Sequence, residues 1–190
     1  FGPERARLAA MLLLTLRGTP TLYYGDELGL PEVEIAPEDQ ADPWGRRVPG
    51  QGRDGCRTPM PWEPGPGGGF TTGSPWLPLG PAAGERNVAA QLADPGSLLN
   101  LYRALLEVRR REPSLHAGSY RRLDAPDGVL AYRREAPDAA AATVLLPSSD
   151  GERPGEAEGT AVVATGMDRD GEAFADRPVL RPYEGVVLLG

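Results

Sequence analysis

The spacing of the apolar residues divides the chain into stretches with different predicted secondary structure. Residues 3–17 are mostly apolar, begin with Pro3 and Glu4 and end at Gly18, a pattern that predicts a helix. Residues 19–24, TPTLYY, are rich in β-branched and aromatic side chains and lie between two glycines, which predicts a short buried strand. A helix followed by a tight turn and a strand is typical of α/β architecture.

The apolar periodicity then disappears from Gly25 to Gly96, where Gly and Pro recur. We predict a long loop here, and a loop of this length is usually functional. Ser97 then caps a predicted helix over 98–111, whose apolar residues follow helical spacing and stop before Pro113.

Beyond Pro113 the texture changes to short strand-like runs separated by Asp, Pro and Gly clusters at hairpin spacing. The runs are GSYRRL, GVLAYRRE, AATVLLP, TAVVAT and PVLRPYEGVVLLG. They predict a small antiparallel β domain. We place the boundary at 113–117, so that residues 1–115 and 116–190 form separate domains.

Charge and cysteine content narrow the class of function. All 20 basic residues are arginine, and 27 acidic residues bring the net charge to −7, which argues against nucleic acid or an anionic membrane as a partner. The apolar run at 8–14 is shorter than the roughly 20 residues of a membrane span. Cys56 is the single cysteine, so neither a disulfide within the chain nor a thiolate metal cluster is expected, and we predict a cytoplasmic location.

Several short motifs have a structural interpretation. Gly50, Gly52 and Gly55 match G-x-G-x-x-G, but no strand precedes them and no helix follows, as a dinucleotide site requires. DRDG at 168–171 predicts a hairpin turn rather than a calcium loop.

The remaining polar features of the second half are also interpreted structurally. The arginine pairs 121–122 and 133–134 predict a solvated face of the β domain. His116 is interpreted as a surface or packing histidine, because no nucleophile elbow accompanies it.

Two carboxylates, Asp26 and Glu27, follow the predicted strand at its C-terminal end, where chemistry sits in α/β barrels. The alternative is a helix cap or a loop anchor, and we favour it. Adjacent side chains point apart, so these two carboxylates do not easily flank one scissile bond.

The stretch GRDGCRTPMPW, 52–62, is the second candidate site. Arg57 can form two parallel hydrogen bonds to a carboxylate or to sugar hydroxyls. Pro59 and Pro61 stiffen the chain, and Trp62 offers a flat face on which sugars stack. The alternative is that Arg53–Asp54 and Arg57 only pin a long loop, and the residues alone leave both interpretations open.

Four ordered motifs together resemble the last third of α-glucosidases of the α-amylase superfamily, glycoside hydrolase family 13, in the branch with oligo-1,6-glucosidases and glucosyl-transferring relatives. They are GTPTLYYGDELGLPE, DPWG, GRDGCRTPMPW and SLLNLYRALLEVRRREPSL. The resemblance implies that residues 20–24 are the last strand and 98–111 the last helix of a (β/α)8 TIM barrel, followed by an antiparallel β-sandwich. The expected fold class is therefore α/β followed by all-β.

The resemblance also implies a substrate site. The arginine of the family's R-T-P motif pairs with an aspartate from an early barrel strand and contacts the non-reducing-end glucose, and Arg57 occupies that place. We expect Asp54, Arg53, Tyr23 and Glu27 to belong to the same substrate-binding region, with Asp26 helping to shape the barrel mouth. The expected substrates are short α-glucoside oligosaccharides attacked from the end, and no cofactor or metal ion is expected.

The family's retaining reaction needs an aspartate nucleophile, a glutamate acid/base and a stabilising aspartate, and none of those motifs is present. We expect them upstream of Phe1, in a barrel portion that function requires, and we predict that this chain alone is inactive. Two alternatives stay open: a non-catalytic glycosidase-like protein that binds a partner, and another superfamily specificity, namely an amylase, a trehalose-forming or a sucrose-isomerising enzyme. The chain does not decide between α-1,4 and α-1,6 linkages.

Overall fold

The computed structural model describes residues 2–48, 50–175 and 177–190, and the chain forms two compact units. The sheet unit comprises the chain as far as Thr21 together with Asn100–Gly190, and the loop unit comprises Leu22–Leu99. These two units are defined by contacts in space, whereas the predicted division at residue 115 was based on the change in residue pattern along the sequence. That division stays a prediction.

Helix α1 spans Pro3–Thr15, two residues shorter than predicted, with Pro3 in its first turn. Its buried residues are Ala10, Met11, Leu14 and Thr15, so one side of the helix faces the interior of the sheet unit. The predicted helix is confirmed.

The predicted strand at 19–24 is wrong, because the structure forms no strand there. A strand needs a neighbour that exchanges backbone hydrogen bonds with it. No segment in the described part of the chain pairs with residues 19–24, and Leu22, Tyr23 and Tyr24 are exposed. The composition of residues 19–24 favours a strand locally, but strand pairing depends on distant residues.

Helix α4 spans Leu98–Arg111, as predicted, and buries Leu101, Leu105 and Val108 on one side. The single turn α5, Pro113–His116, follows directly. His116 is exposed, and its Nδ1 lies 3.1 Å from the carbonyl oxygen of Arg109. The interpretation of His116 as a surface or packing residue is therefore confirmed.

All strand pairs are antiparallel, which confirms the predicted β domain. A six-stranded sheet has the order β1-β2-β3-β8-β5-β6, and β4 pairs with β7 in a second sheet. The bounds are β1 Arg121–Arg122, β2 Val129–Arg134, β3 Ala142–Pro147, β4 Arg153–Pro154, β5 Gly159–Ala164, β6 Ala173–Phe174, β7 Val179–Leu180 and β8 Val186–Leu189. The second sheet has only two short strands, so the sandwich stays a prediction.

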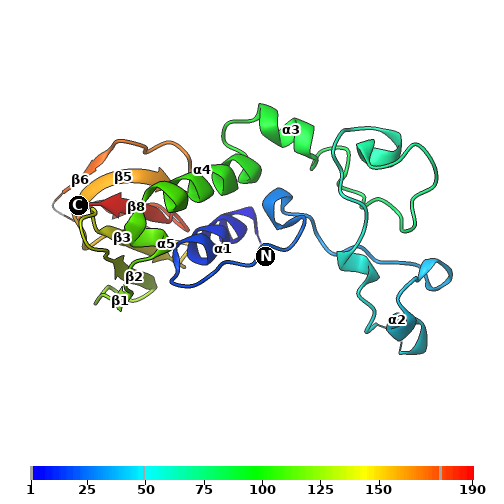
Figure 1. The fold of residues 1–190 in the computed structure, drawn as a ribbon, viewed down its shortest axis with the longest axis horizontal. Coiled ribbons are helices and arrows are strands. Elements are labelled where there is room, and N and C mark those ends of the chain that lie inside the picture. Colours follow the sequence, from blue (N-terminus) through cyan, green and yellow to red (C-terminus); the bar gives the residue numbers. More distant parts are fainter. Residues whose placement is uncertain (1, 49, 176) are drawn as a thin grey trace. The chain divides into compact units, whose positions relative to one another are not determined.

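The large sheet is covered on both faces. On one face, Ala131, Leu145 and Leu188 form a cluster with Leu180 of β7. Neighbouring positions of a strand point to opposite faces. On the other face the Tyr132 hydroxyl lies 2.5 Å from Oγ1 of Thr15 in α1. Figure 1 shows α1 and α4 lying along the sheet.

The arginine pairs of the β domain differ in burial. Arg121 and Arg122 are exposed, as predicted, and the Arg133 side chain is part-buried. Arg134 is 0 % exposed, so the prediction of a solvated face is wrong for this residue. Alternation along β2 places Arg134 on the same face as Tyr132, which is the face that contacts α1.

Two buried arginines bind the C-terminal end of α1. Arg134 Nη1 donates to the Thr15 carbonyl at 2.5 Å, and Arg109 donates to the carbonyls of Leu14, at 2.8 Å, and Gly18, at 2.5 Å. The last carbonyls of a helix lack partners within the helix and carry its negative dipole end, so cations are favoured there. Burial lowers the pKa of both guanidinium groups. We call Arg109 and Arg134 the arginine clamp.

The loop unit contains short helical segments joined by irregular chain, where a continuous loop was predicted. Helix α2 spans Pro43–Arg47 and α3 spans Val88–Ala93. The 3-10 turns are Asp26–Leu28, Pro37–Asp39, Asp54–Cys56 and Pro66–Gly69. The α3 helix was missed, although Asn87 caps it by accepting from the Ala90 nitrogen at 2.9 Å. Among the described residues, no helix is long and apolar enough to span a membrane.

Candidate functional site

Asp54 organises the loop around the RTP sequence. Its side chain is buried, with the residue 3 % exposed, and Oδ2 accepts hydrogen bonds from the backbone nitrogens of Ala41, at 2.7 Å, and Asp42, at 2.8 Å. Both donors lie about a dozen residues earlier in the chain. The Asp54 carboxylate therefore joins two distant arms of the loop.

Asp42 makes the reciprocal connection. Its Oδ1 caps α2 by accepting from the Trp44 nitrogen at 3.0 Å, and its Oδ2 accepts from the Arg53 nitrogen at 3.0 Å. The Arg53 Nε lies 3.4 Å from the same oxygen, while most of the Arg53 side chain stays exposed. The two backbone hydrogen bonds hold the pKa of the Asp42 carboxyl below its ordinary value. The loop therefore has a fixed backbone and an exposed guanidinium.

Three glycines allow the arms to approach closely. A Cβ on Gly45 would lie 2.8 Å from Cα of Gly52, and one on Gly55 would lie 2.4 Å from the Val33 carbonyl oxygen. The Val33 nitrogen donates to the Gly55 carbonyl at 3.0 Å. Gly52 and Gly55 of the G-x-G-x-x-G match are therefore packing glycines, in keeping with the rejection of a dinucleotide site.

Arg57 is presented by this fixed backbone. It follows the 3-10 turn Asp54–Cys56, and its nitrogen donates to the Asp54 carbonyl at 2.9 Å. The next residues, Thr58 and Pro59, are buried. The Arg57 side chain is exposed, and its guanidinium has no hydrogen-bond or ion-pair partner within residues 2–48, 50–175 and 177–190. A charged group on a rigid support is thus free to bind a ligand.

The two tyrosines after the predicted strand contact the same loop. The Tyr24 hydroxyl donates to the Thr58 carbonyl at 2.5 Å, and the Tyr23 hydroxyl lies 3.8 Å from Sγ of Cys56. Their rings are 5.6 Å apart. Partial burial raises the pKa of the Tyr24 hydroxyl. Tyr23 therefore contacts the residue that precedes Arg57 in the chain.

Asp26 and Glu27, the carboxylates that follow the predicted strand, are less closely connected to the loop around Arg57. Asp26 Oδ2 accepts from the Tyr23 nitrogen at 3.4 Å, which agrees with the loop-anchor interpretation. Glu27 is half-buried in the 3-10 turn Asp26–Leu28, and no contact among the described residues joins it to Arg57. Its assignment to substrate binding stays a prediction.

The contributions of Asp42, Trp44 and Tyr24 to this loop were not predicted. The DPW sequence contained a usable signal, because Asp before Pro is a strong start for a helix. No group of three or more His, Cys, Asp or Glu side chains suited to a metal ion occurs in the part of the chain that the structure describes.

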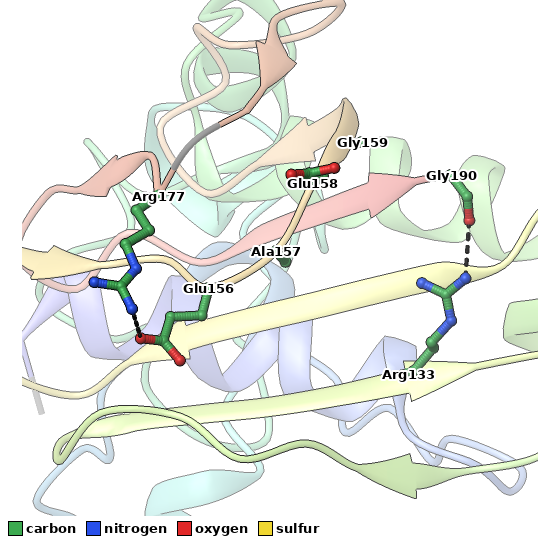
Figure 2. Close-up of a pocket in the computed structure, with 7 residues that line it drawn as sticks. All are labelled: Arg133, Glu156, Ala157, Glu158, Gly159, Arg177 and Gly190. Atoms are coloured by element: carbon green, nitrogen blue, oxygen red, sulfur yellow. Dashed lines mark hydrogen bonds and ion pairs between the residues drawn. The ribbon is translucent and has the colours of Figure 1, made fainter.

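A hollow of about 740 Å³ occurs in the sheet unit (Figure 2). Its arginines are already engaged: Arg177 Nη2 lies 3.3 Å from Glu156 Oε1, and Arg133 Nη2 donates to the Gly190 carbonyl at 3.1 Å. None of the predicted site residues lines it. The loop around Arg57 is therefore the better candidate site.

Comparisons with known proteins identify the family of the chain. Residues 2–118 match the model of the alpha-amylase catalytic domain. Over 131 residues the chain is 44% identical to a protein from Rhizobium meliloti (strain 1021) named probable alpha-glucosidase, a match that covers 68% of this chain and 24% of that protein.

Two solved structures are similar over nearly the whole chain. The alpha-glucosyl transfer enzyme XgtA is 36% identical with a TM-score of 0.82, covering 100% of this chain and 36% of that one. Trehalulose synthase MutB from Pseudomonas mesoacidophila MX-45 is 28% identical with a TM-score of 0.83, covering 98% and 38%. The chain thus spans about a quarter of its curated relative and somewhat more than a third of the solved structures.

Proposed function

Because the chain belongs to the α-amylase family, glycoside hydrolase family 13, we propose that it forms part of a retaining, exo-acting α-glucosidase that removes terminal glucose from short α-linked oligosaccharides. The family resemblance of its motifs is confirmed by the match over residues 2–118. The activity is our proposal, since the chain covers 24% of the relative named probable alpha-glucosidase.

The unpaired guanidinium of Arg57 carries this proposal. An exposed arginine without a partner among the described residues, on a backbone fixed by Asp54 and Tyr24, is a ready donor of two parallel hydrogen bonds. We assign one partner to a hydroxyl of the terminal glucose. The other is a carboxylate of the barrel portion that this chain does not contain.

The neighbouring residues take different roles in the proposal. We propose that Arg53 and Tyr23 contact substrate. Asp54 holds the loop rather than the sugar, because its Oδ2 already accepts two backbone hydrogen bonds. We propose that Glu27 lies at the barrel mouth, an assignment that only the family resemblance supports.

The chemistry itself requires groups from elsewhere. Retaining hydrolysis places a nucleophilic carboxylate and an acid/base carboxyl about 5 Å apart across the scissile bond. In our proposal both, and the stabilising aspartate, come from the preceding barrel portion, and this chain alone is inactive. The cytoplasmic location stays a prediction.

Glucosyl transfer or sucrose isomerisation is a second candidate, since the similar solved structures are named as an alpha-glucosyl transfer enzyme and a trehalulose synthase. These reactions would share the same retaining intermediate and differ in the acceptor. A non-catalytic partner-binding protein is less well supported, because it has no need of an unpaired Arg57.

The test is a chimera in which this chain replaces the matching segment of the Rhizobium meliloti protein. We expect it to hydrolyse nitrophenyl α-glucoside and to release single glucose units from the end of maltotriose or isomaltotriose. Residues 1–190 alone serve as the control and should show no turnover. Internal cleavage of longer glucans, or turnover by the control, contradicts the proposal.

A further inference from the structure

The arginine clamp binds four carbonyl oxygens around the end of α1. These carbonyls belong to Leu14, Thr15, Leu16 and Gly18. Arg109 binds three of them, with Nη1 donating to the Leu14 carbonyl at 2.8 Å and to the Leu16 carbonyl at 3.1 Å. Arg134 is 0% exposed and binds the fourth, at Thr15. The end of the helix is therefore held by residues that lie 91 to 119 positions later in the chain.

The helix has no local arrangement that closes this end. The common closure places a glycine in the left-handed region and returns one or two backbone hydrogen bonds to the last turn. Here the C-cap residue Leu16 is extended, with φ −62° and ψ 156°, and its nitrogen donates to the Leu12 carbonyl at 3.0 Å. Within the described residues, neither Arg17 nor Gly18 donates a backbone hydrogen bond to the helix. The direction in which the chain leaves α1 is therefore set by the clamp.

The clamp lies directly before the segment that carries the two tyrosines. Gly18 is followed by residues 19–24, which form no strand, and the Tyr23 side chain is exposed. Beyond it, the Tyr24 hydroxyl donates to the Thr58 carbonyl. Residues 19–23 thus join two anchored points of the chain and have no strand partner of their own among the described residues. A short segment of this kind takes its path from its two ends, so a displacement at Gly18 is passed on to Tyr23.

Burial makes the geometry of the clamp strict. Arg134 also donates to the carbonyls of Gly118 and Ser119, and the Tyr132 hydroxyl lies 2.5 Å from Oγ1 of Thr15. Burial raises the pKa of that hydroxyl to about 12, so it stays neutral. A buried donor or acceptor that loses its partner is strongly disfavoured. The end of α1 therefore keeps one position as long as both guanidinium groups are intact.

We propose that Arg109 and Arg134 are positioning residues of the candidate site. They act through the main chain, because the clamp fixes the end of α1 and with it the start of the segment that leads to Tyr23. The inference rests on the proposed function, since it takes Tyr23 to contact substrate. It gives a residue of the β domain, Arg134, an influence on substrate binding that its place in the sequence does not indicate.

The single cysteine reports on Tyr23 without a measurement of activity. Cys56 is exposed, and its Sγ lies 3.8 Å from the Tyr23 hydroxyl. The experiment measures the rate at which Ellman's reagent modifies Cys56 in the full chain. Tyr23→Ala should raise this rate and sets its upper limit. Arg109→Lys and Arg134→Lys keep the charge but lose the planar fork, so each should raise the rate several-fold towards that limit. The control Arg122→Met, on exposed β1, should leave the rate unchanged.

The same lysine variants are then made in the Tyr23→Ala background. If the clamp acts through Tyr23, neither variant should accelerate the reaction further there. A general loosening of the chain would raise the rate by the same factor in both backgrounds, and that result overturns the inference, as does a rate that neither clamp variant changes. Circular dichroism verifies that each variant is folded, and sucrose is added to restore the folded state of a variant that is not.

The chimera tests the consequence for the reaction. Arg134→Lys should lower kcat/KM for nitrophenyl α-glucoside several-fold, and this loss should largely disappear in the Tyr23→Ala background. In the Arg57→Ala background the full factor should remain, because Arg57 does not lie on the segment that follows the clamp. An equal factor in all three backgrounds is the mark of a merely structural role and contradicts the inference.

The two proposals fail separately. An active chimera, together with Cys56 rates that the clamp variants do not change, removes the positioning role and leaves the α-glucosidase assignment intact. The expected Cys56 rates with an inactive chimera remove the assignment and leave the conformational connection between the clamp and Tyr23.

Discussion

The Oδ2 atom of Asp54 lies 2.8 Å from the backbone nitrogen of Asp42, and the Asp42 carboxylate in turn binds the nitrogen of Arg53, the residue before Asp54. Each aspartate thus fastens the backbone at the other. Carboxylates that accept backbone N–H groups form charge-assisted hydrogen bonds, which are stronger than neutral ones. This reciprocal arrangement holds the backbone that carries the exposed arginines of the loop.

Replacing Asp54 should loosen the loop. Asp54→Ala leaves the nitrogens of Ala41 and Asp42 without their acceptor, a local cost of about 1–3 kcal/mol. Limited trypsin digestion should then cleave after Arg46 and Arg47 several-fold faster than in the unchanged chain. Asp54→Asn keeps one acceptor oxygen and should be intermediate. Equal cleavage of all three proteins would show that the carboxylate does not hold the loop.

Replacing Arg57 should impair catalysis without affecting stability. Because its guanidinium has no partner within the described residues, Arg57→Ala should shift the urea midpoint of the chain very little. In the chimera the lost hydrogen bonds to a charged donor, about 1.5–3 kcal/mol, should lower kcat/KM about 10- to 150-fold. Arg57→Lys keeps the charge but not the paired geometry and should recover only part of the loss. Unchanged kinetics would remove Arg57 from the site.

Replacing Arg134 should destabilise the sheet unit. Arg134→Met keeps the length of the side chain but removes the donors to the carbonyls of Thr15, Gly118 and Ser119. At roughly 1–3 kcal/mol for each buried group left unsatisfied, the free energy of unfolding should fall by about 3 kcal/mol or more. Arg122→Met is the matched control on exposed β1 and should cost under about 0.5 kcal/mol. Urea unfolding followed by circular dichroism measures both, and equal losses would contradict the structural role of Arg134.

The ion pair between Asp168 and Arg181 should make stability depend on pH. Its two N–O distances are 2.6 and 2.7 Å, and the guanidinium holds the pKa of the Asp168 carboxyl below its ordinary value of 3.8. A carboxyl whose pKa is lower in the folded state stabilises the fold above 3.8, and the contribution is lost as the pH falls through the folded value. Asp168→Asn should therefore lower the urea midpoint at pH 7, and this loss should shrink as the pH falls below 3.8.

Asp170 is the matched control of opposite sign. Desolvation raises the pKa of its carboxyl in the folded state, so the charged form is disfavoured there. Asp170→Asn should raise the urea midpoint at pH 7, and the gain should disappear as the pH falls below 3.8. A loss of stability in this variant at pH 7 would contradict the assignment.

Local patterns predicted the elements that depend on local physics. The 98–111 helix has apolar residues at helical spacing and a proline at its end, and the structure forms it with those bounds. The 19–24 strand failed because strand pairing depends on residues far away in the chain. The two-residue strands β4 and β6 were missed because they are too short to show an alternation.

The candidate site was predictable in part. The RTP stretch identified Arg57 because so many bulky and charged residues gather there. The burial of Arg134 was not predictable, since its partners are backbone carbonyls, which no sequence pattern marks. The Asp42–Asp54 arrangement was hidden for a similar reason, because each carboxylate binds main-chain nitrogens rather than a recognisable opposite charge.

Acid should open one part of the sheet unit before another, whereas heat should unfold both parts together. The arginine clamp binds carbonyl oxygens, which do not titrate, so protons remove none of its acceptors. The ion pair between Arg181 and Asp168 is different, because its acceptor is a carboxylate that acid protonates. In an acid titration the β5–β6 end of the sheet should therefore begin to exchange its amide hydrogens while the anchored end of α1 is still protected.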